Sequence, residues 1–509
     1  MVSDERRPVL VGVGQVRGNR GRTVGDAREP LALIIDAVRA AAADALVAGA
    51  PGAAGPAALD LHTLDSVSTV HVASWAYADL AARIAAAVGA TSAHLVDTTV
   101  GGQRPAELLE EAAARIAAGE SRCALIAGGE AQASAQALYR AGIDPAAHGW
   151  SATPGGPPRF DTDDLRSPAM RATGIILPTR VYPLFENALR HAQGETPEQG
   201  ARASAQLYAA FSQVAAANPA AWNPEPRTAD EIGTVGPGNR MVCEPYPLAV
   251  NAMPHVDQAA AVLVMSLAAA REAGVREERI VHVWGGAAAH DAVDVLTRPT
   301  FAASAALSDV LDRTLAAAGI GAADLDVIDV YSCFPVVPKL VGAHLGIAPP
   351  AGVTGGHSAF GGPLSSYTLH ALVAVTGALR AGARHALVHG NGGYLTHQHA
   401  LVLAREPHPD GYIGDPEPRD TAGPAPAAVD ALDGEDVTVE TATVEHGRDG
   451  APAQGFVVAR TADGARFAAS TAPGDVASAG ALSLDRGETV GRVVRATTTG
   501  EHAVVELLR

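Results

Sequence analysis

Apolar residues along the chain follow two alternating patterns. Short runs of aliphatic and β-branched residues, such as 9–15 and 93–100, are typical of buried strands. Between them lie alanine-rich stretches such as 31–46 and 76–90, in which larger apolar residues recur at helical spacing. This alternation of strands and helices predicts an α/β protein with a mostly parallel sheet covered by helices.

The succession of predicted elements occurs twice. The matched segments, each given as first copy and then second copy, are 9–15 and 280–287, 31–46 and 306–320, 64–74 and 325–334, 104–118 and 369–382, and 122–131 and 384–393. Alanine-rich sequences resemble one another by chance, but chance does not preserve the order of the units. We therefore predict two similar α/β halves.

The chain, at 509 residues, is too long for a single hydrophobic core. A stretch rich in Pro, Arg and Trp interrupts the first half and contains an amphipathic helix at 197–217, as expected of a cap or binding region. After residue 407 a Pro/Gly/Asp-rich stretch precedes short alternating strands with hairpin signals. The predicted units are an N-terminal half at 1–132 plus 251–275, an insertion domain at 133–250, a C-terminal half at 276–407, a linker at 408–432 and a small β-barrel at 433–509.

Composition narrows the range of partners. Asp and Glu outnumber Lys and Arg by 55 to 37, so the formal net charge is −18 and general attraction to nucleic acid or an anionic membrane is not expected. The longest apolar run, 259–270, is too short to span a bilayer, and the first residues lack the apolar core of a signal peptide. Three cysteines in so long a chain indicate no disulfide framework. We therefore expect a cytoplasmic protein that binds neither nucleic acid nor a membrane.

Candidate chemistry lies at one turn and three loops. The strand at 93–100 leads through Val100-Gly101-Gly102 into the helix at 104–118, which places main-chain N–H groups at a helix N-terminus. Enzymes often mount a nucleophile at such a turn, but Val100 has no reactive group. The three loops are YSCF at 331–334, TGGHSAFGGPLSSY at 354–367 and HGNGGYL at 389–395.

These motifs, with AGGEA at 127–131 and the two tandem halves, resemble the thiolase superfamily over residues 8–407. The resemblance is closest to divergent thiolase-like proteins usually labelled acetyl-CoA acetyltransferase, a subgroup that often adds a C-terminal β-domain. It implies the duplicated, layered α-β-α-β-α thiolase fold, an OB-like barrel at the C-terminus and an acyl-CoA ligand bound through its coenzyme A. It also implies an acyltransferase-type role in lipid metabolism.

The reactive side chains of thiolases are missing from the matching positions. The nucleophilic cysteine falls on Val100, the Gly-His-Pro histidine on Gly362, the second cysteine on Gly390 and the motif asparagine on Tyr331. Ping-pong thiolase chemistry needs a cysteine thiolate to take up the acyl group. We therefore expect no thiolase reaction of that kind.

Other groups at these positions remain usable. The main-chain N–H groups of Val100 and Gly392 need no side chain and could form an oxyanion hole for a thioester carbonyl. A phenol at position 331 can donate a hydrogen bond or serve as acid or base. The side chains predicted at the site are Tyr331, His357, Tyr367 and Tyr394. In the insertion, the region that cradles CoA in thiolases, Arg171, Arg180 and Arg240 are candidates for its phosphates, although ordinary surface charge is the commoner role of arginine.

Two further functions stay open beside an acyltransferase-type reaction. Steroid side-chain aldolases are thiolase-like proteins that also lack the cysteine, and the chain is similar to them in having Tyr331 and a β-domain that could stand for their separate OB-fold partner. That similarity implies retro-aldol cleavage of a β-hydroxyacyl-CoA. The other function is a non-catalytic CoA-binding scaffold whose β-domain recruits a protein partner. A homodimer is compatible with each of these functions.

The remaining motifs are less specific. Cys333 beside Phe334 is typical of a buried small hydrophobic residue. His397 and His399 share a strand face but have no third ligand at metal-binding spacing, so no metal is predicted. GHSAF at 356–360 lacks the last glycine of an esterase elbow, and GVGQVRG at 12–18 has the wrong spacing for a dinucleotide loop.

Overall fold

The computed structural model describes residues 4–20, 23–46, 58–92, 94–158 and 165–508. The first half of the fold is built from strands and helices on both sides of the insertion. Its strands are β1 (Pro8–Arg17), β2 (Ser66–Thr69), β3 (His94–Asp97), β4 (Cys123–Ala131) and β7 (Asp257–Ser266). Its helices are α1 (Pro30–Ala45), α2 (Leu80–Val88), α3 (Arg104–Ala118) and α9 (Leu267–Glu272).

The second half repeats this arrangement. Its strands are β8 (Val281–His290), β9 (Val327–Val330), β10 (His385–Gly392) and β11 (His397–Ala404). Its helices are α10 (Ala305–Ala318), α11 (Val336–Leu345) and α12 (Tyr367–Arg380). Strand order is β2-β4-β7-β1 in the first half and β9-β10-β11-β8 in the second, and each set begins with a parallel pair. The predicted duplication of the fold is therefore confirmed.

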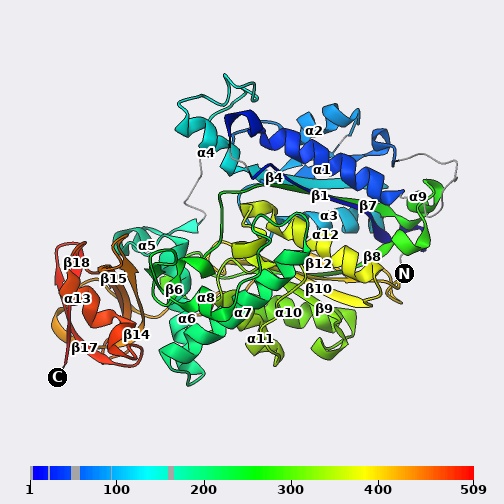
Figure 1. Cartoon of the computed structure of the whole chain (residues 1–509). Helices are drawn as coiled ribbons and strands as arrows, with labels where there is room; N and C mark the ends of the chain where they lie inside the picture. The colour runs from blue at the N-terminus through cyan, green and yellow to red at the C-terminus, as the bar shows by residue number, and fades with distance from the viewer. Residues whose placement is uncertain (1–3, 21–22, 47–57, 93, 159–164, 509) are drawn as a thin grey trace.

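The two halves meet along β1 and β8, which pair antiparallel at Val9–His282 and Leu10–Val281. Figure 1 shows α1 and α2 above the first set of strands, α3 and α12 between the two sets, and α10 and α11 below the second set. The inner helices pack on strands of both halves, because α3 and α12 contribute to the same apolar cluster. The result is the predicted five-layer thiolase architecture, with the N-termini of both inner helices in its middle layer.

The sheet is mixed, and the prediction of a mostly parallel sheet is wrong. β7 runs antiparallel to both β4 and β1, and β11 runs antiparallel to both β10 and β8. β10 and β11 are joined by residues 393–396 alone, and a connection so short allows only an antiparallel hairpin. The prediction assigned each apolar run to one strand of a βαβ unit, and it therefore missed this hairpin.

The insertion is mainly helical. Its helices are α4 (Gln132–Arg140), α5 (Pro168–Thr173), α6 (Pro178–Ala192), α7 (Pro197–Ala217) and α8 (Ala229–Gly233). α7 begins with a capping box in which Thr196 and Gln199 satisfy each other's main-chain N–H groups, and Pro197 occupies its first turn. α6 and α7 pack on the second half of the core.

The C-terminal domain is a β-sheet wrapped on one helix. Its elements are β13 (Ala428–Val429), β14 (Asp433–His446), β15 (Pro452–Arg460), β16 (Arg466–Ser470), α13 (Val476–Leu482), β17 (Val493–Thr499) and β18 (His502–Leu507). The insertion adds β5 (Met241–Cys243) and β6 (Tyr246–Pro247) to this sheet through a contact with β14. Figure 1 shows the domain as a lobe beside the insertion.

Part of the predicted linker is folded. Residues 415–420 form β12 (Asp415–Asp420), which pairs with β8 of the main sheet. The Pro/Gly-rich composition indicated a coil, but the exposed edge of β8 supplies a partner for an extended chain. Among the described residues no helix is both long and apolar enough to cross a membrane.

Candidate functional site

The Val100-Gly101-Gly102 turn lies at the start of α3, as its sequence predicts. Helix α3 begins at Arg104, after Gln103 at the N-cap. One main-chain donor of this turn is already used, because the N–H of Gly101 donates to Ser365 Oγ at 3.2 Å. The turn is therefore held against the loop that precedes α12.

Tyr331 lies directly on this turn. A β-carbon placed on Gly102 would be 2.4 Å from two ring carbons of Tyr331 and 2.5 Å from the carbonyl oxygen of Asn391. Tyr331 is 9% exposed, and its hydroxyl donates to the carbonyl of Leu364 at 3.3 Å. Burial raises the pKa of this phenol above its usual value, so it stays protonated at neutral pH and can donate a hydrogen bond but not act as a base. The ring fills the space beside the helix N-terminus.

His357 and Tyr367 extend Tyr331 into a buried aromatic cluster. The rings of His357 and Tyr367 stack at 3.5 Å between centroids, and the Tyr331 ring meets His357 edge-on at 4.3 Å. Ser332 Oγ lies 3.2 Å from His357 Nδ1 and 3.4 Å from the Tyr367 hydroxyl. Burial lowers the pKa of His357, so the imidazole is neutral, and its Nε2 has no hydrogen-bond partner among the described residues. The structure thus brings together three side chains that the sequence predicted for one site.

The side chain of Gln103 occupies the space between Gly101 and Gly392. A β-carbon on Gly392 would lie 1.9 Å from Gln103 Oε1, and one on Gly101 would lie 2.4 Å from the same atom. Gln103 is 5% exposed, and its Oε1 lacks a hydrogen-bond partner within the described part of the chain. Sequence reasoning missed this residue, because glutamine is not a usual N-cap residue.

A histidine, two amides and a phenol form a series of hydrogen bonds along β10. His389 Nε2 lies 2.7 Å from Gln398 Oε1, and the amide of Gln398 donates to Asn391 Oδ1 at 2.6 Å. The Asn391 amide in turn donates to the hydroxyl of Tyr182 at 2.9 Å. Sequence reasoning missed this series, although Asn391 lies within the HGNGGYL motif. Its side chains fix β10, and therefore Gly392, against the insertion.

Cys333 is no thiolate. Burial raises the pKa of its thiol to about 12, and the Asn391 amide lies 3.9 Å from its sulfur. A thiol with so high a pKa is protonated at neutral pH and reacts poorly as a nucleophile. The predicted packing role of Cys333 agrees with this environment.

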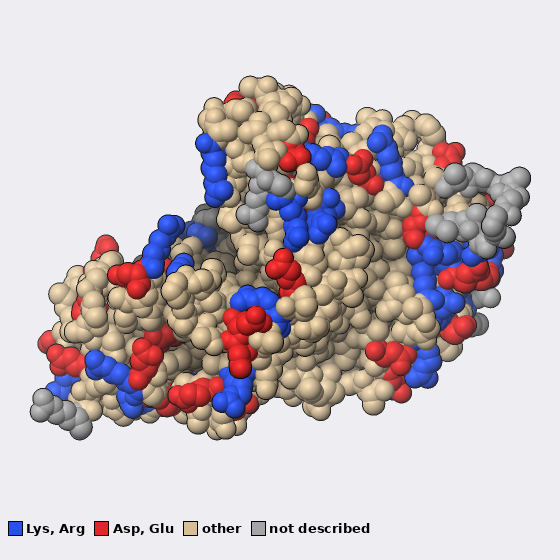
Figure 2. All heavy atoms as spheres, in the orientation of Figure 1, with Lys and Arg blue, Asp and Glu red and all other residues tan. Residues whose placement is uncertain are grey.

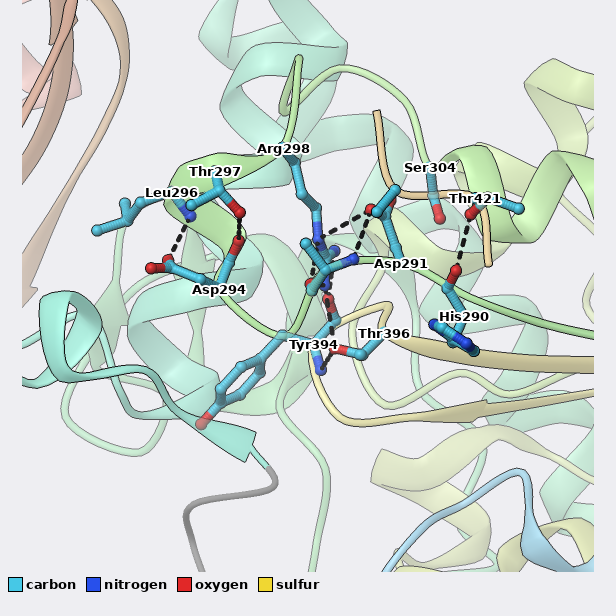
Figure 3. Close-up of polar contacts among 12 residues, drawn as sticks. His290, Asp291, Asp294, Leu296, Thr297, Arg298, Ser304, Tyr394, Thr396 and Thr421 are labelled. Carbon is cyan, nitrogen blue, oxygen red and sulfur yellow. Dashed lines mark hydrogen bonds and ion pairs between the residues drawn. The ribbon is translucent and has the colours of Figure 1, made fainter. Parts of the chain in front are cut away.

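Tyr394 lies apart from the Tyr331 cluster, on the β10–β11 loop. Its hydroxyl donates to the carbonyl of Ile176 in the insertion at 2.5 Å. The next residue, Leu395, has a φ of 58°, a left-handed conformation that a branched side chain rarely adopts. Figure 3 shows the Arg298 side chain reaching this loop, and its guanidinium donates to the carbonyl of Tyr394 at 2.7 Å and to Thr396 Oγ1 at 3.0 Å.

Arg298 is itself held by the C-terminal domain. Arg466, on β16, donates to the carbonyl of Arg298 at 2.5 Å and to that of Leu296 at 2.7 Å. The other side of the Arg466 guanidinium pairs with Glu440 on β14. Arg298 and Arg466 are each 2–3% exposed, so these contacts exclude water. Two buried arginines therefore connect the C-terminal domain to the loop that follows Gly392.

The three arginines predicted for CoA lie where the insertion meets the C-terminal domain. Arg180 forms an ion pair with Glu445 on β14 at 2.7 Å, and this carboxylate offsets its positive charge. Arg171, on α5, lines a cavity of about 670 Å³ between α5 and the C-terminal sheet. Arg240, next to β5, donates to the carbonyl of Met241 at 3.0 Å. Acidic and basic side chains are interspersed over the face shown in Figure 2. A phosphate therefore requires a local group of basic side chains, such as these arginines.

No group of three His, Cys, Asp or Glu side chains within the described ranges is arranged to hold a metal ion. His399, one member of the predicted histidine pair, is bonded to the buried Glu110. The partner of this histidine is therefore a carboxylate of the core.

The fold and the site define a member of the thiolase superfamily whose nucleophile turn lacks its cysteine. The chain is 30% identical to a monomeric SCP2-thiolase-like protein type 1 from Mycobacterium smegmatis, with a TM-score of 0.79 and 100% of each chain covered. The chain therefore belongs to the SCP2-thiolase-like protein type 1 family. The family model described as the thiolase-like protein type 1 additional C-terminal domain matches residues 419–501.

Two more distant structures share the fold. The Ltp2-ChsH2(DUF35) aldolase is 18% identical, with a TM-score of 0.57 over 78% of this chain and 97% of that chain. Human mitochondrial 3-ketoacyl-CoA thiolase is 17% identical, with a TM-score of 0.54 over 79% of this chain and 99% of that chain. No curated protein matches the sequence.

Proposed function

We propose that this protein binds a CoA thioester without forming an acyl-enzyme. The observation that carries the proposal is the contact of Tyr331 with Gly102, because it places a phenol ring against the turn whose matching position carries the nucleophile in thiolases. Val100 supplies no nucleophile, and the Cys333 thiol stays protonated. The ligand class is proposed by analogy, since a protein that shares the fold is named as a 3-ketoacyl-CoA thiolase.

Recognition of the thioester would fall to main-chain and phenol donors. The N–H groups of Val100 and Gly392 remain our candidates for the carbonyl oxygen. The Tyr331 hydroxyl would add a third donor by exchanging its hydrogen bond to the Leu364 carbonyl for one to the thioester. Gln103 lies against Gly392 and Gly101, so its side chain would have to rotate when the carbonyl approaches Gly392. For the phosphates of CoA our candidates are Arg171, which lines the cavity between α5 and the C-terminal sheet, and Arg240.

Calorimetry with CoA, acetyl-CoA and decanoyl-CoA tests binding, and intact-mass spectrometry of the same mixtures tests acylation. We expect saturable binding, an unchanged protein mass and no hydrolysis of the thioester. Arg171→Ala should weaken binding about tenfold to a hundredfold, as expected for loss of one charged hydrogen bond. Arg495→Ala, on an exposed strand of the C-terminal domain, is the matched control.

Retro-aldol cleavage is the competing function. It is favoured by the burial of Tyr331 beside a neutral histidine and opposed by the raised pKa of the phenol, which disfavours a base. Incubation with a β-hydroxyacyl-CoA separates the two functions, with the aldehyde or ketone product measured by mass spectrometry. Cleavage by the parent protein that is lost in Tyr331→Phe would overturn our proposal in favour of the retro-aldol function. An acyl adduct on any residue would also overturn it.

A further inference from the structure

A polar cavity lies at the end of the strands opposite the candidate site. Its volume is about 590 Å³, and it is bounded by the residue before β1, by α9, by the turn that leads into β8 and by the residues after β11. β8 pairs with β11 from His282 to His290, and Gly392 lies at the His290 end of this pairing. Figure 1 shows α9 and β8 at the end of the molecule where the N-terminus is marked. A ligand bound here would therefore be separated from the loop after Gly392 by the length of β8.

Charged side chains supply most of the cavity wall. Two of the described residues that line it are apolar, and the others are three arginines, three glutamates and one histidine. Two of the glutamates are paired: Glu277 lies 2.9 Å from Arg271. Glu278 contacts Arg276, an arginine that does not itself line the cavity. Counting Arg276, four guanidinium groups meet three carboxylates, which is a local excess of positive charge in a chain whose formal net charge is −18.

Arg405 is held in place by main-chain carbonyls. Its Nη1 donates to the carbonyls of Glu278 and Ile280 at 3.1 and 3.3 Å, and it forms no ion pair among the residues that the structure describes. Its Nε and Nη2 have no hydrogen-bond partner in that part of the chain and keep surface that solvent can reach. Arginine presents these two groups as a fork of parallel N–H donors, which binds two oxygens of a carboxylate or phosphate at once. The fork of Arg405 is therefore available to a ligand in the cavity.

His282 lines the same cavity and is 8% exposed. Neither of its ring nitrogens is fully buried, and neither has a hydrogen-bond partner among the described residues. The pKa of its imidazole is lowered to about 4, first by burial and then by the positive charge of Arg7, whose effect exceeds the opposing one of Glu277. Arg271 and Arg405 lower this pKa further. The ring is therefore neutral at pH 7, can donate one hydrogen bond to a ligand, and lies in a positive potential.

We propose that this cavity binds a small anion that carries a phosphoryl group, with the phosphoryl oxygens held by the Arg405 fork and by the His282 imidazole. A phosphate monoester carries about 1.5 to 2 negative charges at pH 7 and three acceptor oxygens, so it gains more than a monocarboxylate from these donors and from the guanidinium groups nearby. Glu406 also lines the cavity, but it is exposed, so water and salt screen its repulsion. The site is distinct from the proposed CoA site and does not depend on it.

Glycerol 3-phosphate and glycerol are a matched pair of probes, because they differ only in the phosphoryl group. Calorimetry in a phosphate-free buffer at constant ionic strength should show saturable binding of glycerol 3-phosphate and none of glycerol. Arg405→Met should weaken this binding about tenfold to a hundredfold, as expected for loss of charged hydrogen bonds. Arg405→Lys keeps the charge and loses the fork, so it should weaken binding about threefold to tenfold. The control is Arg495→Met in the C-terminal domain, which should leave the affinity unchanged.

Two further measurements do not depend on a change at Arg405. Arg271→Gln alters a side chain that is 56% exposed, so the fold should be kept while binding weakens about threefold to tenfold. In the parent protein, glycerol 3-phosphate should slow hydrogen exchange at 277–282 and leave 389–395 unchanged. Equal affinity in Arg405→Met and the parent protein, or slowed exchange at 389–395 instead of 277–282, would overturn the proposal. So would CoA binding that weakens in Arg405→Met, because the two ligands would then share one site.

Discussion

Arg466 on β16 donates a hydrogen bond of 2.5 Å to the main-chain carbonyl of Arg298, which in turn holds the carbonyl of Tyr394. The C-terminal domain is thereby joined to the loop that follows Gly392, through two guanidinium groups that are shielded from water. The neighbouring Leu395 keeps its left-handed conformation although this costs about 1–2 kcal/mol. The domain is therefore part of the scaffold of the candidate site.

Removing this link should loosen the loop. Arg466→Met removes charged hydrogen bonds to two carbonyls, each of which is worth roughly 1.5–3 kcal/mol. We expect amide hydrogen exchange at residues 393–396 to become about tenfold to a hundredfold faster, measured by mass spectrometry of peptides. Arg495→Met, which breaks an exposed ion pair with Asp436, should leave this loop unchanged. Equal exchange in both variants would show that Arg466 does not position the loop.

The contact between Gly102 and Tyr331 predicts an energetic coupling. Gly102→Ala places a methyl group against the ring and should lower the free energy of unfolding by about 1–3 kcal/mol. Tyr331→Ala removes the ring, so the double variant should be less destabilised than the sum of the single variants. Coupling will be incomplete, because the carbonyl of Asn391 also crowds this position. Urea denaturation of the parent protein, the two single variants and the double variant measures this coupling energy.

Gly377 provides the control for that cycle. It lies within α12, and a β-carbon there would meet no atom within 4 Å. Gly377→Ala should therefore raise the stability by up to about 1 kcal/mol through helix propensity. Strict additivity of Gly102→Ala and Tyr331→Ala would mean that the ring does not occupy the turn in solution.

Local signals explain which elements the sequence could predict. The expected helix at 197–217 coincides with α7, since Thr196, Pro197 and Gln199 mark its start within a few residues of sequence. The expected helix at 104–118 coincides with α3. The antiparallel pairing of β10 with β11 and the pairing of β12 with β8 depend on neighbours in space, and hydrophobic periodicity does not report them.

The residues of the candidate site also divide into those that a sequence motif identifies and those that only the folded chain brings together. Val100, Tyr331 and His357 could be assigned to one site because each lies in a recognisable motif. Gln103 was missed because glutamine at an N-cap is not a usual signal. Arg298 and Arg466 are separated by 168 residues and lie in no motif, so their contact becomes visible only in the folded chain.

Buried neutral histidines should make the protein sensitive to acid. Burial lowers the pKa of His389 to about 4 and that of His370 to about 3, from 6.5 for an unfolded chain. Below pH 6.5 these histidines become protonated in the unfolded state but stay neutral in the folded state. Protonation therefore lowers the free energy of the unfolded state alone, and this loss of stability is absent only above pH 6.5. Stability should then decrease as the pH falls from 6.5 toward 4. His389 alone accounts for up to about 3 kcal/mol of this loss.

Urea denaturation at several pH values checks this expectation. In His389→Gln the loss of stability between pH 6.5 and 4 should be smaller than in the parent protein, whatever the stability of the variant at neutral pH. His148→Gln, at an exposed position, should keep the parent's pH dependence. A parent protein that is equally stable at pH 4.5 and 7 would contradict the burial of neutral histidines.

Lys339 is the only lysine of the chain and forms a buried ion pair with Glu186. Its ammonium group also donates to Ser204 Oγ and to the carbonyl of Gly200, while Glu186 accepts a second hydrogen bond from Tyr246 at 2.8 Å. Lys339→Met leaves the carboxylate buried without its counter-charge and should destabilise the fold by about 3–5 kcal/mol. Adding Glu186→Gln removes the charge but keeps an acceptor for Tyr246, so the double variant should recover most of the loss. Urea denaturation measures both, and a single variant as stable as the double one would show that the pair is open to water.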